Sequence, residues 1–371
     1  MKKVILATTN DLSTDQRVHR TAITLLSMGA SVLMVGRVKG NALPLIDRPY
    51  RTKRFHLLFR KGIFFYATYN LRLLIYLLFH HADIIVSVDL DTLLACTVAA
   101  WIKNAELVYD CHEYFTEVPE LVDRHRVKAF WARLERSLLP GIKHSYTVNS
   151  SLADIYNLKY NQNMQVIRNL PLKKDKVYFV PEVLNFPGRK ILLYQGSLNM
   201  GRGIELAIEA MQWVDSAVLA IIGSGDIEHD LKKLTERLNL ADKVYFIGRV
   251  PMENLHNFTS CAYLGLSLEE KLGLNYFYAL PNKIFDYIQA HVPILVSDLP
   301  EMSAIVQRYQ VGAIVKSRTP RELAKQISEI LTDENTYRLW RSNLMQVSSM
   351  LVWENEASRL RSIFIKAGLT N

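Results

Sequence analysis

The first half of the chain alternates short apolar runs with longer segments whose apolar positions recur at helical spacing. Short β-branched runs separated by helical segments are typical of parallel strands joined by crossover helices. A first helix is predicted over residues 13–27, and Gly29 follows it in the usual position for glycine after a helix end. The predicted strands of this half are Val4–Ala7, Ser31–Val35, Ile84–Val88, Glu106–Asp110 and His144–Val148.

A proline- and lysine-rich stretch, Arg168 to Arg189, breaks this alternation and marks the best domain boundary. The pattern then restarts, and 371 residues suffice for two domains that each have a core. We therefore expect an α/β protein of two doubly wound, Rossmann-like domains, over 1–170 and 171–351, facing across a cleft that holds the ligand. The later predicted strands are Ile191–Tyr194, Ala217–Ile222, Val244–Ile247, Tyr263–Leu266 and Ile294–Ser297.

The segment from Leu280 to Glu301 carries the most informative local pattern. Pro281 suits the first turn of a helix, where its missing N–H costs nothing. Helix N-termini bind phosphate, whereas the nearby carboxylate of Asp286 suits a neutral diol such as a ribose. The pairing predicts a bound nucleotide. The helix itself is predicted from the apolar positions Ile284, Phe285, Ile288 and Ala290.

Composition and charge change this picture in the first half only. The net charge of +9 lies almost wholly in residues 1–170, and nine basic residues against one acid fall between Arg37 and Arg72, among seven aromatic residues. Such a surface binds anionic membrane or nucleic acid. The aromatics recur at helical spacing and match no nucleic-acid module, so we expect membrane rather than nucleic acid; a solvated basic face is the alternative.

Three further features place the protein in the cytoplasm. The N-terminal apolar run stops at Thr8, as a strand does and a signal peptide does not. The longest candidate for a membrane span, Leu73–Phe79, is far shorter than the roughly 18–20 residues required. Cys96, Cys111 and Cys261 are widely spaced, which suits buried thiols in a reducing compartment.

The 280–301 segment resembles the nucleotide-sugar-binding segment of retaining glycosyltransferases with the GT-B fold, family 4 in particular. Asp286 and Pro293 keep the family's spacing of seven. The resemblance implies that Asp286 holds the ribose hydroxyls of the donor. It covers nearly the whole chain and implies that the last helix, 352–371, packs back onto the first domain.

One departure concerns the family's paired glutamates, which lie eight positions apart. The partner position of Asp286 is Tyr278 here, and the nearest carboxylates are Glu269 and Glu270. Glu270 is our candidate for contact with the donor sugar.

Glycine-rich turns mark further donor contacts. Gly196 follows a predicted strand and Arg202 begins the next helix, so backbone and guanidinium can approach a diphosphate. The family pattern places two basic residues here; Arg202 matches the second, and Ser197 replaces the first. Lys283 is a candidate substitute, with a snorkelling surface lysine as the alternative. The remaining donor candidates are Gly223, Arg249, Val250 and Asn282, of which Arg249 and Val250 would touch the base.

The first half offers candidates for the sugar and the acceptor. His112 follows a predicted strand and matches the family's histidine at the donor sugar, with Glu113 bracing the loop. Asp15 and Arg17 lie where the family binds acceptor. Alternatively, Asp15 caps the helix and Arg17 pairs with it.

No metal site is predicted. Asp89 and Asp91 have the spacing with which transferases hold Mn²⁺ or Mg²⁺. They lie in the acceptor half, however, where Asp91 can cap a helix. Basic residues and helix dipoles stabilise a leaving diphosphate without metal.

The sequence thus predicts a metal-independent, cofactor-free retaining glycosyltransferase at the inner face of a membrane, with a nucleoside diphosphate sugar as donor and a glycan or lipid-linked acceptor. His112, Arg202 and Lys283 are the predicted catalytic residues. Two rivals remain: a nucleotide-sugar epimerase, which Glu113 and Glu117 would serve as acid and base, and a non-catalytic binding protein, suggested by Tyr278 and Ser197.

Overall fold

A computed structural model describes residues 1–13, 15–38, 47–121, 123–174 and 179–369. The chain forms two compact units, one made of residues 1–169 and 354–371 and the other of residues 170–353. The predicted boundaries lie at 170/171 and 351/352. The first unit therefore contains both ends of the chain.

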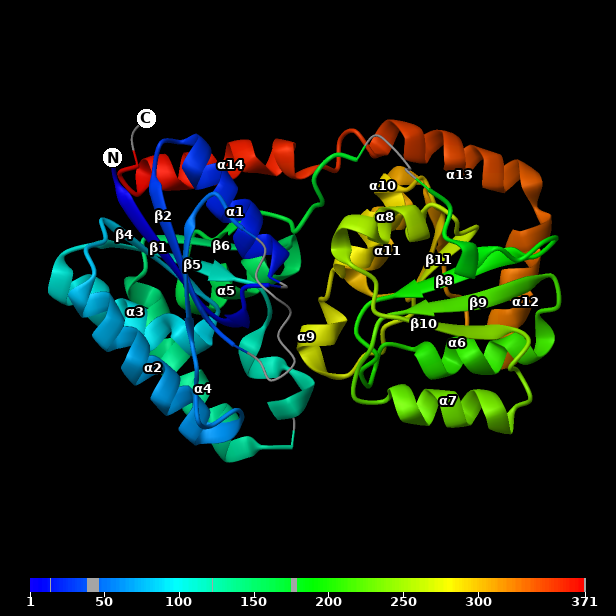
Figure 1. The fold of residues 1–371 in the computed structure, drawn as a ribbon, viewed down its shortest axis with the longest axis horizontal. Coiled ribbons are helices and arrows are strands. Elements are labelled where there is room, and N and C mark those ends of the chain that lie inside the picture. The colour runs from blue at the N-terminus through cyan, green and yellow to red at the C-terminus, as the bar shows by residue number, and fades with distance from the viewer. Residues whose placement is uncertain (14, 39–46, 122, 175–178, 370–371) are drawn as a thin grey trace. The chain divides into compact units, whose positions relative to one another are not determined.

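The first unit is built on a seven-stranded, wholly parallel sheet in the order β3-β2-β1-β4-β5-β6-β7 (Figure 1). The two central strands are in register, with Val4 of β1 opposite Val32 of β2 and Ile84 of β4. The strands are β1 (Lys3–Asp11), β2 (Ser31–Arg37), β3 (Arg51–Phe55), β4 (Ile84–Val88), β5 (Glu106–Cys111), β6 (His144–Thr147) and β7 (Gln165–Val166).

Helices cover both faces of this sheet. In Figure 1, α2, α3 and α4 lie on one face, and α1 and the C-terminal helix α14 lie on the other. The helices are α1 (Gln16–Ser27), α2 (Gly62–Phe79), α3 (Leu90–Lys103), α4 (His125–Leu138), α5 (Ser150–Tyr160) and α14 (Trp353–Lys366). An ion pair ties α14 to this unit, because Arg168 lies 2.6 Å from the buried carboxylate of Glu356.

The second unit has a six-stranded parallel sheet in the order β10-β9-β8-β11-β12-β13. Its strands are β8 (Lys190–Gln195), β9 (Ala217–Ile222), β10 (Val244–Gly248), β11 (Leu264–Ser267), β12 (Ile294–Val296) and β13 (Gly312–Ile314). Its helices are α6 (Ile204–Ala210), α7 (Glu228–Arg237), α8 (Met252–Thr259), α9 (Gly273–Phe277), α10 (Asn282–Gln289), α11 (Pro300–Tyr309), α12 (Pro320–Thr332) and α13 (Glu334–Val347).

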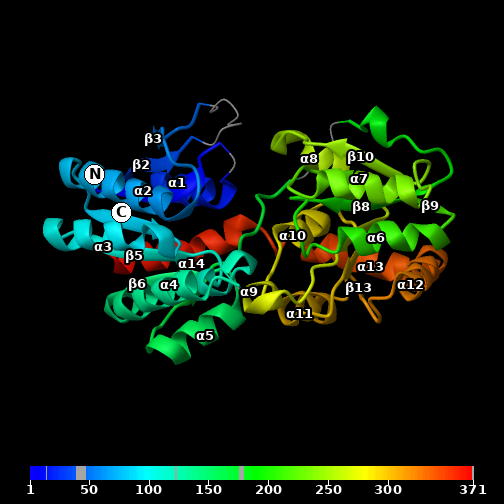
Figure 2. The ribbon, with the colours of Figure 1, turned by 90° about the horizontal axis from the view of Figure 1, so that it is seen from below.

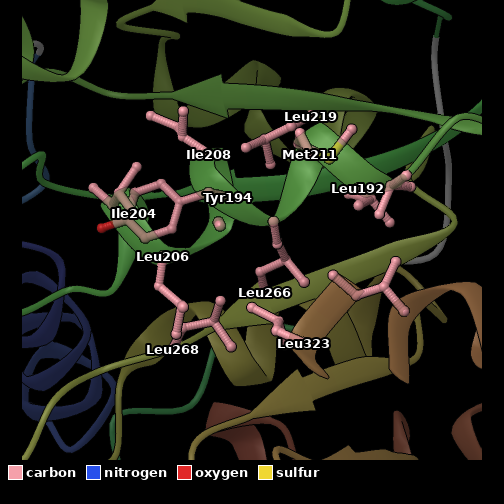
Figure 3. Close-up of a cluster of buried hydrophobic side chains, with 14 of the residues drawn as sticks. Leu192, Tyr194, Ile204, Leu206, Ile208, Met211, Leu219, Leu266, Leu268 and Leu323 are labelled. Carbon is pink, nitrogen blue, oxygen red and sulfur yellow. The ribbon is translucent and has the colours of Figure 1, made fainter. Parts of the chain in front are cut away.

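Two apolar clusters flank this second sheet. One joins alternate residues of β8, β9 and β11 to α6 and α12, and Figure 3 shows Leu192, Leu219, Leu266 and Leu323 meeting in it. The other joins the opposite face to α10 and α11. Because both faces are covered, the strands are apolar throughout rather than alternating, as expected of a parallel sheet.

Each sheet reverses its strand order at one place, and that place positions the candidate site residues. The reversal falls between β1 and β4 in the first sheet and between β8 and β11 in the second (Figure 1). Parallel α/β sheets bind ligands beyond the carboxyl ends of the strands at such a switch point. The segments after these strands are therefore where a site is expected in each unit.

The structure corrects two local predictions. Pro281 precedes α10 as its N-cap residue instead of lying in the first turn, and the helix begins at Asn282. In the first unit β3 was not predicted, because three of its five residues are basic; it forms the edge of the sheet, where charged side chains reach solvent.

A third correction concerns the longest apolar segment. Helix α2 has 18 residues with a mean hydropathy of 1.4, which makes it long and apolar enough to cross a membrane, whereas the sequence pattern suggested only Leu73–Phe79. Tyr, Thr and Asn residues interrupt the apolar run, and Arg72 is the single charged residue of the helix. Only 22% of this helix is buried within the protein.

Candidate functional site

In the second unit, two glycine turns meet at the ends of β8 and β9. Gly196 and Gly223 both have φ near +137°, a conformation that side chains other than glycine rarely adopt. A Cβ on Gly223 would lie 1.8 Å from the Gly196 carbonyl oxygen, so the two backbones touch. The Gly196 turn thus presents bare backbone at the switch point, with Gly196 and Ser197 exposed.

Lys283, in the first turn of α10, points toward this turn. Its Nζ would lie 3.7 Å from a Cβ on Gly196 and is 4.0 Å from the ring centroid of Tyr194. The side chain is only 8% exposed. The snorkelling alternative for Lys283 is therefore wrong, since the ammonium group is enclosed by protein beside the glycine turn.

The partner of Lys283 is Glu269, which lies two residues beyond β11. Its Oε1 is 2.9 Å from Lys283 Nζ and 3.8 Å from Arg202 Nη1, and its Oε2 accepts a hydrogen bond from the Ser267 hydroxyl at 2.7 Å. Burial by itself raises the pKa of Glu269, but the charges of Lys283 and Arg202 outweigh burial and lower it. One buried carboxylate thus faces two cations, and the group keeps a net positive charge.

Glu270, the carboxylate favoured from the sequence, lies differently. Its carboxylate is 3.7 Å from Arg318 and is about two-fifths exposed. Arg318 also donates to the backbone carbonyls of Leu268 and Glu269, so it braces the loop that carries both glutamates. The sequence pattern favoured Glu270 and did not predict that Glu269 is the carboxylate that pairs with Lys283 and Arg202. Its spacing from Ser267 at the end of a strand could have indicated it, because residues two apart point to the same side.

Asp286 lies one turn after Lys283 on α10 and is partly buried. Its Oδ2 accepts a hydrogen bond from Gln195 Nε2 at 3.1 Å, and Gln195 Oε1 accepts one from the Thr259 hydroxyl at 2.7 Å. The buried amide of Gln195 therefore fixes the orientation of the carboxylate. The last residue of β8 and the carboxylate of α10 are held together beside the Gly196 turn.

The other donor candidates surround this turn. Asn282 is exposed in the first turn of α10, Gly223 follows β9, and Val250 is partly buried after β10. Arg249 is exposed, and its Nε donates to the Ser224 hydroxyl, which links the loops after β9 and β10. Arg202 stacks over the Tyr276 ring at 4.8 Å.

The first unit contains a second polar group, buried after β4 and β5. The carboxylate of Asp110 is 1% exposed and lies 2.9 Å from the guanidinium of Arg17 and 3.0 Å from Nε2 of His112. It also accepts a hydrogen bond from the Tyr146 hydroxyl at 3.0 Å. Burial by itself raises the pKa of Asp110, but Arg17 and His112 lower it to about 2.

Arg17 accordingly has another role than the sequence suggested. Besides Asp110, it donates to the carbonyl of Ile167 at 2.8 Å, and its side chain is 3% exposed. The predicted acceptor contact would need an exposed guanidinium, and the alternative partner Asp15 is replaced by Asp110. Asp15 itself caps α1, because its Oδ1 accepts from the backbone N–H of Val18 at 3.2 Å.

Asp89 connects β4 to His112. Its Oδ1 accepts from the backbone N–H of His112 at 2.7 Å, and its Oδ2 lies 3.8 Å from His112 Nδ1. Asp89 has φ of 59°, which for a residue with a side chain marks a strained backbone of the kind found at functional sites. Burial by itself lowers the pKa of His112, but Asp110 and Asp89 raise it to about 9, so the imidazole is charged at neutral pH.

Asp91 does not cap α3 as predicted. The N-cap residue is Asp89, and Asp91 lies in the first turn, where its carboxylate accepts a hydrogen bond from the Thr9 hydroxyl at 2.6 Å. Burial raises the pKa of Asp91 to about 7. Within the described residues, no group of three or more His, Cys, Asp or Glu side chains is arranged to hold a metal ion.

Comparison with known proteins bears on the family and the fold. Residues 179–346 match the sequence model of the family described as glycosyl transferases group 1. Among curated proteins, a chitobiosyldiphosphodolichol β-mannosyltransferase of Candida albicans is 23% identical over 185 residues, which span 47% of this chain but only 40% of that protein.

Solved structures match over nearly the whole chain. A sucrose-phosphate synthase from Thermosynechococcus elongatus is 18% identical with a TM-score of 0.79, and the match covers 99% of both chains. HepE of Anabaena, in complex with UDP and glucose, is 14% identical with a TM-score of 0.77 over 99% of this chain and 100% of that one. WaaG, a glycosyltransferase of lipopolysaccharide biosynthesis, is 14% identical with a TM-score of 0.70 over 97% and 99%. The second unit thus carries the sequence pattern of the group 1 glycosyltransferases over residues 179–346, and the two parallel α/β sheets give the chain a GT-B-like fold.

Proposed function

We propose that this protein transfers a hexosyl group from a nucleoside diphosphate sugar to a glycan or lipid-linked acceptor, with retention of configuration and without a metal ion. The observation that carries the proposal is the group formed by Lys283, Glu269 and Arg202 beside the Gly196 turn. Two cations against one carboxylate leave a positive charge next to exposed backbone, which suits a diphosphate.

The donor would be oriented by groups on either side of that charge. Asp286, held by Gln195, would accept the ribose hydroxyls, and Lys283 and Arg202 would contact the diphosphate. Charge on the diphosphate grows as the bond to the sugar breaks, so cations fixed before the reaction stabilise the transition state more than the ground state. Lys283 would thereby supply the positive charge that Ser197 lacks.

Relatives support the choice of substrates. HepE has been crystallised with UDP-glucose, the Candida protein is by name a mannosyltransferase acting on a dolichol-linked sugar, and WaaG takes part in lipopolysaccharide biosynthesis. UDP-glucose is accordingly the first donor to test, and a lipid-linked glycan of surface polysaccharide assembly is the first acceptor. His112 stays a prediction for contact with the donor sugar, as does Glu270.

A nucleotide screen followed by a transfer assay tests the proposal. Ligands that bind the native state raise the melting temperature, so UDP, GDP, ADP and CMP can be ranked by thermal shift. Incubation of the preferred nucleotide sugar with and without acceptor then separates the possible activities. Acceptor-dependent release of nucleoside diphosphate supports transfer. A new nucleotide sugar formed without acceptor would mean epimerisation, and binding without either product would mean a non-catalytic protein.

A further inference from the structure

Helix α2 turns an apolar face away from the protein. Its inward side chains recur every fourth residue, and Phe65, Tyr69, Leu73 and Leu77 are at most 3% exposed. A surface helix ordinarily carries polar residues on its other side. Here Phe64, Leu71, Ile75 and Phe79 occupy that side and are 48–84% exposed.

The same surface continues across the two neighbouring helices. Figures 1 and 2 show α3 beside α2 on one face of the sheet, with α4 following. Lys103 of α3 donates to the carbonyl of Leu78 at 3.0 Å, and the Tyr66 ring of α2 meets Trp131 of α4 at 5.1 Å. Trp101 on α3 and Phe130 on α4 are 83% and 58% exposed. We define the apolar face as Phe64, Leu71, Ile75, Phe79, Trp101 and Phe130.

The exposed charges on the three helices themselves have one sign. The three helices carry only two acidic residues, Asp91 and Glu135, and both are buried. Exposed basic residues lie at the start of α2 and along α4, among them Arg60, Lys61, Arg126 and Arg133. A broad apolar surface on helices whose exposed charges are all basic is complementary to lipid that is apolar inside and anionic at its surface.

We propose that the apolar face binds the surface of an anionic lipid bilayer and seats this protein there as a peripheral membrane protein. The helix lies in the interface instead of spanning the bilayer. Tyr69 hydrogen-bonds to the carbonyl of Thr8, and the inward residues of α2 belong to the core beneath the sheet. Withdrawing α2 into a membrane would expose that core, whereas the outward side chains enter lipid without any change of fold.

A second copy of this chain suits the apolar face less well. A two-fold dimer places the same surface on both partners, so the basic residues of these helices would face each other. Like charges brought together in this way oppose association. A bilayer offers an apolar interior to the exposed apolar side chains and anionic headgroups to the basic residues around them. It would also hold a lipid-linked acceptor near the enzyme. The inference itself does not depend on which sugar is transferred.

Vesicle sedimentation with the full chain tests the proposal. Vesicles of phosphatidylcholine alone are compared with vesicles containing a third of phosphatidylglycerol, each at low and high salt. We expect binding to the anionic vesicles that weakens with salt, because exposed charges are screened. Replacing Arg60, Lys61, Arg126 and Arg133 by Gln should weaken binding about tenfold or more. Replacing Phe64, Leu71 and Ile75 by Ser should weaken it at both salt concentrations.

Matched controls come from the second unit. Leu339, Met345 and Met350 are also exposed and apolar, and Lys232, Arg237, Lys325 and Arg338 are exposed and basic. Their substitution by Ser and Gln, respectively, should leave vesicle binding unchanged. Equal sedimentation with both kinds of vesicle, or equal loss in test and control variants, would overturn the proposal. So would a dimer in sedimentation velocity that only the Phe64, Leu71 and Ile75 variant dissociates.

A depth measurement gives an independent readout. Lipids brominated in their acyl chains should quench the fluorescence of Trp101. The Trp101→Phe variant should lose most of this quenching but should still sediment with the vesicles. Quenching that persists unchanged in Trp101→Phe would place another part of the chain in the bilayer and contradict the proposed face. Neither measurement involves sugar transfer, so failure here and failure of the glycosyltransferase assay are separate results.

Discussion

The ammonium group of Lys283 lies 2.9 Å from the carboxylate of Glu269, and both side chains are buried. Arg202 approaches the same carboxylate oxygen at 3.8 Å and is more exposed. The loop after β11, the turn after β8 and the first turn of α10 are therefore joined by charge at one point. Because Lys283 and Glu269 are buried, each of these charges needs the others to offset the cost of removing it from water.

Lys283→Met should destabilise the protein, because Glu269 would keep only Arg202 and Ser267 as partners. Breaking a buried pair in this way costs about 3–5 kcal/mol of unfolding free energy, and removing both charges costs less. We expect the Lys283→Met, Glu269→Gln double variant to recover part of that loss in urea denaturation. Both variants should lose affinity for nucleoside diphosphate.

The control is Lys316→Met, since Lys316 is 78% exposed on the same unit. It should change neither stability nor binding. Full nucleotide affinity in the double variant would mean that Lys283 serves only to neutralise Glu269, and the assignment to the diphosphate would be wrong.

Local periodicity predicted the frame of the fold. The alternation of apolar runs and helical segments gave both parallel sheets, and the pattern around Asp286 predicted α10 and β12 nearly to the residue. The edge strand β3 was missed because its residues Arg51, Lys53 and Arg54 read as a solvated loop. Apolar patterns of this kind reveal strands whose side chains are buried. An edge strand is only half buried, so its sequence carries a weaker signal.

The candidate sites depend on pairs that are far apart in the sequence. Arg17 and Asp110 are separated by 93 positions, and Lys283 and Glu269 belong to different elements. No spacing rule connects such residues, so the sequence located the strands that end at the site but did not show that Arg17 is buried against Asp110 or that Glu269 pairs with Lys283. The sequence predicted a basic, aromatic surface between Arg37 and Arg72, but it did not show which side of α2 faces outward or that α3 and α4 extend that surface.

The charge of His112 should make stability depend on pH in the alkaline range. Its folded pKa of about 9 lies above the ordinary value of 6.5. The charged imidazole therefore stabilises the fold fully below pH 6.5, and this contribution is lost as the pH rises through 9. The unfolding free energy of wild type should exceed that of His112→Gln clearly at pH 6 and much less at pH 10.

The Asp89→Asn variant tests whether Asp89 is one cause of the raised pKa of His112. Loss of one neighbouring carboxylate should lower the pKa of His112, which NMR of the histidine ring reports directly. An unchanged histidine titration would show that Asp89 does not contribute to the charge.

Arg17→Met should act on stability rather than on acceptor affinity. The variant leaves Asp110 buried with only His112 and Tyr146, so a loss of about 3–5 kcal/mol of unfolding free energy is expected. Arg359→Met, on the exposed side of α14, is the control and should be neutral. A stable Arg17→Met protein with a raised KM for acceptor alone would restore the sequence-based assignment.

Asp286 and Arg202 should recognise different parts of one nucleotide. A carboxylate that accepts two ribose hydroxyls makes charge-assisted hydrogen bonds of about 1.5–3 kcal/mol each. Asp286→Asn keeps the shape and the contact position of Gln195, and it should weaken both nucleoside diphosphate and bare nucleoside about tenfold or more.

Arg202→Ala should instead cost affinity for the diphosphate and leave the bare nucleoside almost unaffected. It should also reduce kcat beyond its effect on binding, because the charge that it meets grows in the transition state. Calorimetric titration of both variants with nucleoside and nucleoside diphosphate separates the two roles. If the variants lose both ligands to the same extent, or neither ligand at all, the donor does not bind at the Gly196 turn, and the positive charge around Glu269 serves the fold alone.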